Sequence, residues 1–417
     1  MDNSFHISNR KSLYCSLAEG SMLLSFAGNA PRMSSDTYYH FHTNRNFLYL
    51  TGITESQGFI LLVKKAEGKT EEIIFALPKD EMAERWNGKR HSFAEISEIS
   101  GISDVRPLSD FEDIFHKAAI SGEFSALALD LYQYKPGEPE LEPQRFARHT
   151  AKQYPQLRVT DYQSQLRTLR TIKKPCEIDA MKEAMKATRA GILAMMKATK
   201  PGIYEYELLA EFFYACTKMG VLIPSSQPII AAGKNNFCIH YYGYTGKARA
   251  DDMILIDSGA YWDNQWNDVS RAWPASGKFN ERQRLLYQCA YNTSQYMFDL
   301  IKPGMPMADV DRTIRRHCCE QLKVLGLVDS YEEAGKLMWH GGAHHVGYDV
   351  HDAVDTERDS EKPISPGMVF CVDIGIYCEE WGIGFRLEDN CLVTEDGCIN
   401  LSADIPRSIE DIEEVFS

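Results

Sequence analysis

The sequence lacks the features of membrane, secreted and nucleic-acid-binding proteins. No apolar run approaches the roughly 20 residues of a membrane-spanning helix. The first twenty residues have no basic start followed by an apolar core, so we expect no signal peptide. Positive charge is in deficit, since 45 Lys and Arg face 59 Asp and Glu, for a net charge of -14. Nucleic acids and anionic membranes select for Lys and Arg clusters, so neither is an expected partner.

Paired cysteine motifs are also missing. The chain has eleven cysteines, an odd number, and no Cys-x-x-Cys pair. Several lie in apolar runs, such as Cys371 in "MVFCVDIGIY". We therefore predict buried free thiols in a reducing, cytoplasmic compartment rather than a disulfide framework.

The first part of the chain alternates strand-like and helix-like segments. Four short apolar runs bounded by turn residues predict strands at 21–26, 58–63, 71–77 and 125–131. A helix is predicted at 109–120, with Ser109 as its N-cap. These elements indicate an α/β domain with its own core. The change in pattern near residue 170 predicts two domains, 1–170 and 171–417.

The second part contains a long-range repeat. Residues 176–196 have the apolar spacing of an amphipathic helix, and Lys-Pro-Gly and a second helical stretch follow. The same order recurs about a hundred residues later, from residue 281, with a second Lys-Pro-Gly at 302–304. We interpret this as a duplicated α/β unit. Two such halves would face each other about a pseudo-two-fold axis, and a site between them would take ligands from both.

Each half contains two acids beside an apolar strand. Asp257 follows the run 253–256, and Asp268 lies eleven residues further on, so a hairpin could place their carboxylates side by side. Asp373 lies inside an apolar run, and Glu388 lies in a second one. A buried charge is costly unless it is paired or bound to metal. The alternatives are a turn residue and a surface charge in the first half, and an internal ion pair with Arg386 in the second.

The segment "MWHGGAHHVGYDVHD", residues 338–352, holds four of the twelve histidines. Its glycines disfavour a long helix, and Gly341 occupies the glutamate position of a His-Glu-x-x-His motif. Any one of these histidines alone is compatible with a packing role. Four acids and several imidazoles together predict a metal site. Such a donor set favours a harder divalent ion such as Mn²⁺, and a carboxylate can bridge two ions about 3.5–4 Å apart.

These motifs resemble those of the pita-bread metallopeptidases, which include methionine aminopeptidase, prolidase, Xaa-Pro aminopeptidase (aminopeptidase P) and creatinase. The resembling segments are "LIDSGA", "NDVSRAWP", "HGGAHHVGYDVHD", "PGMVFCVDIGIY" and "GIGFRLEDNCLVT", with "YHFHTNRNFLYLTGITES" and "KDEMAERWNGKR" near the N-terminus. The resemblance implies an α/β (α+β) fold. An N-terminal aminopeptidase P/creatinase-like α/β domain would precede a pita-bread catalytic domain with duplicated halves.

The resemblance also implies roles for individual residues. It places metal ligands at Asp257, Asp268, His344, Asp373 and Glu388. It implies catalytic roles for His240, His351, Asp373 and Arg386, and substrate contacts for His240, His340 and His351. The implied cofactors are two divalent ions, Mn²⁺ first, with Zn²⁺ or Co²⁺ as alternatives. Asp268 and Glu388 would bridge them. The family usually has Glu where this chain has Asp373, whose carboxylate reach is shorter by roughly 1.3–1.5 Å.

The implied activity is that of a metal-dependent Xaa-Pro aminopeptidase. It would hydrolyse the N-terminal bond of peptides with proline in second position, through a metal-bridging hydroxide. The alternatives are an Xaa-Pro dipeptidase (prolidase), a hydrolase of this fold with a non-peptide substrate, and a scaffold protein with a degenerate site. The N-terminal domain implies a homodimer or larger homo-oligomer.

Overall fold

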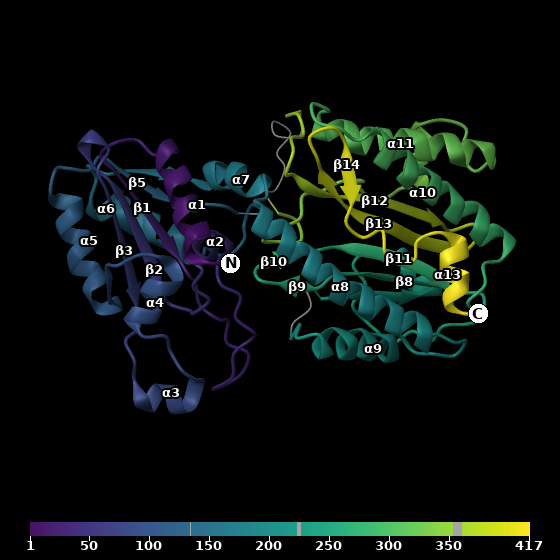
Figure 1. Cartoon of the computed structure of the whole chain (residues 1–417), viewed down its shortest axis with the longest axis horizontal. Coiled ribbons are helices and arrows are strands. Elements are labelled where there is room, and N and C mark those ends of the chain that lie inside the picture. Colours follow the sequence, from purple (N-terminus) through teal and green to yellow (C-terminus); the bar gives the residue numbers. More distant parts are fainter. Residues whose placement is uncertain (134, 223–226, 353–360) are drawn as a thin grey trace. The chain divides into compact units, whose positions relative to one another are not determined.

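The computed structural model describes residues 1–133, 135–222, 227–352 and 361–417. The chain divides into two compact units, Met1–Leu169 and Arg170–Ser417 (Figure 1). Each unit has its own sheets and its own apolar core. Among the described helices, none has both the length and the apolar character that crossing a membrane requires.

The first unit is built on one six-stranded mixed sheet with the order β4-β3-β2-β1-β5-β6. The strands are β1 Ser21–Phe26, β2 Phe59–Lys64, β3 Thr70–Ala76, β4 Val105–Pro107, β5 Ala126–Leu129 and β6 Arg158–Asp161. Strands β1, β2 and β3 pair antiparallel, and the remaining pairs are parallel. The four predicted strands correspond to β1, β2, β3 and β5, because short apolar runs with turn residues at both ends are typical of a buried sheet.

The helices of this unit are α1 Asn3–Ser16, α2 Arg45–Thr51, α3 Glu81–Asn87, α4 Phe93–Ser100, α5 Phe111–Ile120 and α6 Glu142–Gln153, and α7 Gln163–Thr171 follows. Aromatic side chains of α5 and α6 pack on one face of the sheet. The predicted N-cap of α5 is wrong. Residues Leu108–Asp110 form a 3-10 turn, Asp110 occupies the cap position, and the Ser109 hydroxyl donates to the Asp110 carboxylate.

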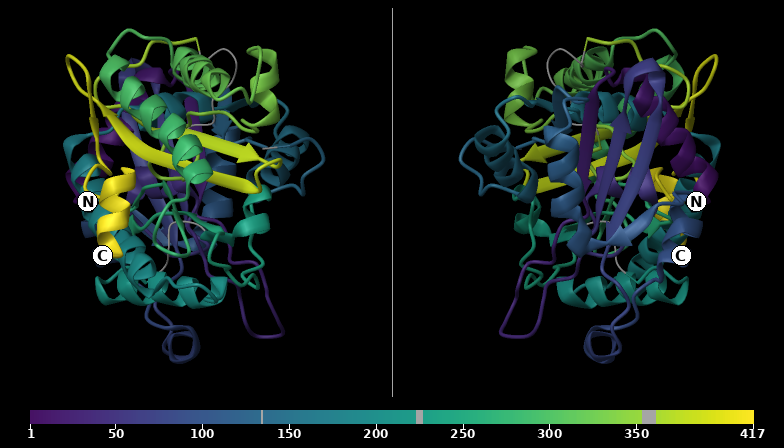
Figure 2. Two further views of the ribbon diagram at one scale, coloured as in Figure 1. Left: turned by 90° about the vertical axis from the view of Figure 1, so that its right-hand side faces the viewer. Right: turned by 90° about the vertical axis from the view of Figure 1, so that its left-hand side faces the viewer.

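The second unit repeats one plan twice, as the sequence predicted. The first half comprises α8 Pro175–Ala198, α9 Glu205–Lys218, β7 Ile229–Ala232, β8 Met253–Ser258 and β11 Val269–Pro274, with the small ribbon β9 Tyr261–Trp262 and β10 Gln265–Trp266. The second half comprises α10 Glu281–Leu300, α11 Met307–Val324, β12 Val369–Cys378, β13 Ile383–Val393 and β14 Cys398–Asn400, and α13 Ile409–Val415 ends the chain. The strands lie between α8 and α9 on one side and α10 and α11 on the other (Figures 1 and 2).

Strands β12 and β13 are buried along their whole length, which explains their nearly continuous apolar sequence. They pair antiparallel from Val369 opposite Leu392 to Cys378 opposite Ile383. Their few charged residues are therefore buried as well and need partners, because an unpaired buried charge is costly.

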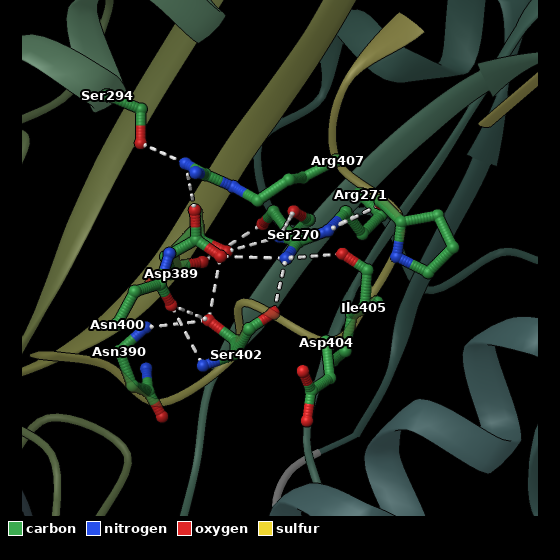
Figure 3. A network of polar contacts seen from close by, with 12 residues as sticks. Ser270, Arg271, Ser294, Asp389, Asn390, Asn400, Ser402, Asp404, Ile405 and Arg407 are labelled. Atoms are coloured by element: carbon green, nitrogen blue, oxygen red, sulfur yellow. Dashed lines mark hydrogen bonds and ion pairs between the residues drawn. The ribbon is translucent and has the colours of Figure 1, made fainter. Parts of the chain in front are cut away.

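One of these charges, Asp389 of β13, forms a fully buried ion-pair network (Figure 3). Arg271 of β11 lies 2.7 Å from one Asp389 oxygen, and Arg407 lies 2.8 Å from the other. Burial alone would raise the pKa of Asp389, but the two guanidinium groups outweigh it and the pKa is lowered. Arg271 also donates to the Glu388 backbone carbonyl at 2.7 Å, so the network fixes a strand of the first half against a strand of the second.

We predict that Arg271→Met destabilises this unit by about 3–5 kcal/mol, because Asp389 loses one of its two buried partners. Urea unfolding followed by tryptophan fluorescence would measure the loss, since five of the six tryptophans belong to this unit. Lys186→Met is the control, because its pair with Glu183 is exposed; we expect a change below about 1 kcal/mol. Equal effects of the two substitutions would contradict the prediction.

Candidate metal centre

The two acids of the first half lie on the predicted hairpin. Strands β8 and β11 pair antiparallel with Ser258 opposite Val269. Asp257 is therefore at the end of β8, and Asp268 immediately precedes β11. Burial, then the charges of Glu388 and Asp257, raise the pKa of Asp268, as expected for carboxylates that lie close together. The hairpin that the sequence predicted thus brings these two acids together.

The two acids of the second half face each other across β12 and β13, with Asp373 directly opposite Glu388. Both are buried, at 8% and 2% exposure. The Ser270 hydroxyl of β11 donates to Glu388 at 3.0 Å, so the first half touches this acid directly. Since successive side chains of a strand alternate in direction, Glu388 faces the acids while Asp389 faces the arginine network.

The histidine segment runs beside β12 and brings His344 to the acids. The backbone N–H groups of Cys371 and Asp373 donate to the carbonyls of His344 and Gly342 at 2.8 and 2.9 Å. A Cβ at Gly342 would lie 3.0 Å from the Asp373 carbonyl oxygen, so a glycine permits this close approach. Nε2 of His344 lies 3.3 Å from Glu388 and 3.8 Å from Asp268.

Four side chains from both halves converge on one point. Among the described residues, donor atoms of Asp268, His344, Cys371 and Glu388 all lie within 4.8 Å of one another. From the sequence, Cys371 was predicted to be a buried thiol and was not among the predicted site residues. Its position two residues before Asp373 on the same strand was the available signal, because residues i and i+2 of a strand point to the same face.

The outer acids, Asp257 and Asp373, have other neighbours. Arg386 of β13 lies 2.8 Å from Asp257. The internal ion pair considered for Arg386 therefore exists, but with an acid of the first half. Asp373 lies 3.2 Å from Nδ1 of His340. Its other oxygen, Oδ1, is buried and makes no hydrogen bond to any described residue.

A chain of hydrogen bonds links these partners behind the site. Arg386 donates to the Tyr377 hydroxyl at 2.9 Å, and that hydroxyl lies 3.0 Å from Nε2 of His340. Arg386 also donates to the Ile239 carbonyl at 3.2 Å and so fixes the residue before His240. His340 and Arg386 thus hold the outer acids and the His240 loop in place.

The remaining histidines separate into two exposed rings and one buried ring. His351 stacks on His344 with ring centroids 4.0 Å apart, and His240 is exposed beside Tyr242. Although His351 is exposed at its edge, the protein atoms packed around its ring, and then the neighbouring His344, lower its pKa to about 4, which favours the neutral form. His345 points away from the acids toward the Val369 carbonyl, and burial lowers its pKa to about 4. We assign it a packing role.

The acids hold more negative charge than their surroundings compensate. Burial, and then the Glu388 charge, raise the pKa of Asp268 and of Asp373. Burial would raise the pKa of Glu388 too, but hydrogen bonds from His344, Cys371 and Ser270 outweigh it and lower that pKa to about 2. A divalent cation would relieve this repulsion. Carboxylate oxygens with one imidazole nitrogen are donors that Mn²⁺, Co²⁺ and Zn²⁺ accept, so the residues fit a metal ion.

The segment that carries His351 is fixed by a second buried network. Asp352 is fully buried, and its two oxygens lie 2.5 Å from Arg170 and 3.1 Å from Lys173. Arg170 also pairs with Asp349 at 2.9 Å. Burial opposes ionisation, but Arg170 and Lys173 outweigh it and lower the pKa of Asp352 to about 2.

Duplicated helix–helix–strand halves that direct acids and an imidazole to one centre define a metallopeptidase of the pita-bread class. Residues 179–395 match the model of metallopeptidase family M24, and residues 6–124 match the aminopeptidase P N-terminal domain. The chain belongs to metallopeptidase family M24, on the aminopeptidase P branch. It is therefore a peptidase, and the fold predicted from the sequence is confirmed.

Relatives of known name extend over nearly the whole chain. Xaa-Pro aminopeptidase 3 of Rattus norvegicus is 30% identical over 92% of this chain and 78% of its own length. Xaa-Pro aminopeptidase of Haemophilus influenzae is 29% identical over 98% and 96%. A Bacillus anthracis protein assigned as an aminopeptidase P has 36% identity and a TM-score of 0.96, covering 100% and 98% of the two chains. Zinc-substituted Escherichia coli aminopeptidase P, solved with product, has 25% identity, a TM-score of 0.90 and the same coverage.

We predict that Asp352 makes the stability of this unit depend on pH in the acid range. Its folded-state pKa of about 2 lies below the unfolded value near 3.9, so its contribution is present above that value and is lost as the pH falls toward 2. The shift corresponds to about 2–3 kcal/mol at pH 7. Urea unfolding of wild type and Asp352→Asn between pH 7 and pH 3 should show the difference shrinking as the pH falls. Asp349→Asn, on the partly exposed partner of Arg170, should have a small effect; a gap that stays constant with pH would contradict the prediction.

Proposed function

We propose that this protein is a metal-dependent Xaa-Pro aminopeptidase that acts on peptides with proline in second position. One observation carries the proposal. Carboxylates of both duplicated halves and the His344 imidazole meet at one centre, with exposed His240 and His351 rings near it. The relatives named Xaa-Pro aminopeptidase cover nearly the whole chain, which favours this substrate over the dipeptides of a prolidase.

The metal ligands we propose are Asp257, Asp268, His344, Asp373 and Glu388. Asp268 and Glu388 are the proposed bridging pair, since both lie within reach of His344 and each interacts with an outer acid. Two divalent ions bound there would polarise the scissile carbonyl and lower the pKa of water. Arg386 and His340 keep the outer acids oriented, as partners behind metal ligands commonly do.

The histidines at the edge of the site are the proposed contacts for the substrate. His351 and His240 are placed to donate to the carbonyl oxygen as negative charge develops on it. Asp373 is the proposed proton acceptor, and His340 at 3.2 Å holds its carboxylate. Asp257, at 17% side-chain exposure, is the most open of the four acids, so we expect the substrate α-amine on its side.

We also propose a reducing compartment and a homo-oligomer. All eleven cysteines are free thiols, which suits the cytoplasm. Trp86 of α3 is 81% exposed, and large exposed aromatic side chains are enriched at interfaces between proteins. Sedimentation of wild type and Trp86→Ala would test the second part, and identical monomeric behaviour of both would contradict it.

We predict that metal-stripped protein reloaded with Mn²⁺, Co²⁺ or Zn²⁺ cleaves Xaa-Pro-Xaa tripeptides and that the stripped protein does not. Release of the first residue, followed by chromatography, is the measurement. Cleavage of Xaa-Pro dipeptides alone would instead indicate a prolidase.

The Asp373→Glu variant is the partner of this experiment, because it restores the usual carboxylate reach. A silent wild type with an active variant would show that Asp373 has diverted the site from proline peptides. Silence of both, with metal bound, would overturn the proposed substrate and leave a non-peptide hydrolase. Silence without any bound metal would indicate a scaffold protein.

We predict that His351→Ala lowers kcat by about a hundredfold to a thousandfold, because a donor to the developing oxyanion is lost. KM should change little, since this contact strengthens only in the transition state. Steady-state tripeptide hydrolysis by the loaded enzyme is the measurement. His317→Ala is the control, because this ring lies on α11 beside Tyr296. A loss confined to KM would assign His351 to ground-state binding instead.

A further inference from the structure

A thiol lies among the proposed metal ligands. The sulfur of Cys371 is one of the four donor atoms that lie within 4.8 Å of one another. Cys371 is wholly buried on β12, two residues before Asp373. The two side chains therefore leave the strand on the same face, toward the acids.

The contacts of this sulfur are polar. Asn390, directly opposite on β13, donates to Sγ at 3.3 Å and to the Asp268 backbone carbonyl at 2.6 Å. The thiol lies 4.0 Å from the Asp268 backbone carbonyl and within 4.8 Å of a Glu388 oxygen. Asn390, which also belongs to the region drawn in Figure 3, thus fixes the sulfur and Asp268 relative to each other. The buried thiol of Cys289 differs, since it donates to the Leu285 carbonyl of its own helix turn at 3.2 Å.

Asp373, which the resemblance implied as a metal ligand, does not join this group. Asp373 lies against His340 and is absent from the four clustered donors. Its side chain is one methylene shorter than glutamate, so it reaches less far toward His344. The fourth donor of the cluster is therefore the sulfur of Cys371 and not an oxygen of Asp373.

We propose that Cys371 supplies a sulfur ligand to the ion held by Asp268, His344 and Glu388. The inference rests on the proposed function only in that a divalent ion binds at this centre. The thiol proton leaves to solvent when the metal–sulfur bond forms, and no oxidation state changes. Because sulfur is a soft donor, the site prefers Zn²⁺, Co²⁺ or Cd²⁺ over Mn²⁺ more strongly than an all-carboxylate and imidazole site would.

The experiment uses the metal-stripped full chain titrated with Co²⁺ and Cd²⁺. We expect a near-ultraviolet sulfur-to-metal charge-transfer band in wild type that is absent in Cys371→Ser. Competition with a chelator should show Cd²⁺ binding weakened by about tenfold to a hundredfold in the variant, the range over which lost metal-site contacts act. Mn²⁺ binding should change far less, since Mn²⁺ gains little from sulfur.

Cys391→Ser is the matched control. Cys391 is also wholly buried, on the strand paired with β12, but it is not one of the clustered donors. Its charge-transfer band should equal that of wild type. X-ray absorption of the Zn²⁺-loaded wild type tests the ligand without any variant, and it should show one sulfur near 2.3 Å. This measurement decides the matter if Cys371→Ser does not fold.

A missing band in wild type, a band that persists in Cys371→Ser, or a zinc shell without sulfur would overturn the inference. Tripeptide cleavage separates this failure from failure of the proposed function. Cleavage without a sulfur signal would leave the aminopeptidase standing with oxygen and nitrogen ligands only. A sulfur signal without cleavage would keep the ligand and remove the substrate.

Discussion

Repulsion among four carboxylates, three of them buried, is the constraint on which the second unit depends. Each acid has at least one compensating neighbour in the structure. Asp257 has Arg386, Asp373 has His340, Glu388 has His344 and Ser270, and Asp268 has His344 at 3.8 Å. These partners orient the acids but do not neutralise them all. The uncompensated negative charge raises the pKa values of Asp268 and Asp373, in addition to their burial. A cation at this centre would complete the charge balance, so binding a metal would also stabilise the fold.

The acids can meet only if the two halves are held in register. The network of Arg271, Asp389 and Arg407 provides that connection, because it joins β11 of one half to β13 of the other immediately behind Glu388. A buried charge pair offsets its desolvation cost only when its geometry is excellent, so this network tolerates little displacement of one half against the other. The alternation of a strand then places Glu388 on the metal side and Asp389 on the structural side, so one short sequence serves both functions.

Much of this arrangement was predictable, for reasons that can be stated residue by residue. The hairpin of Asp257 and Asp268 followed from an apolar strand, a turn and a second strand, and the structure has it. The repeat followed from two helix pairs with the same linker. The prediction of Ser109 as the N-cap of α5 was wrong because a 3-10 turn precedes the helix. Local sequence propensity does not decide whether the helix begins directly or after such a turn. Cys371 was missed because a thiol in an apolar run looks like core, and only the register of β12 with β13 reveals what it faces.

The positions of Asp373 and Cys371 on the same strand suggest how a metal centre can change its donor atoms without a change of backbone structure. Both residues lie on one face of one strand, so the strand can present either side chain to an ion beside His344. Shortening the acid at 373 withdraws an oxygen, and Asn390 fixes a sulfur close by. The backbone need not move, because β12 remains paired with β13 along its length. The choice of metal could thus shift through two side chains while the other proposed ligands, and the histidines at the edge of the site, keep their places.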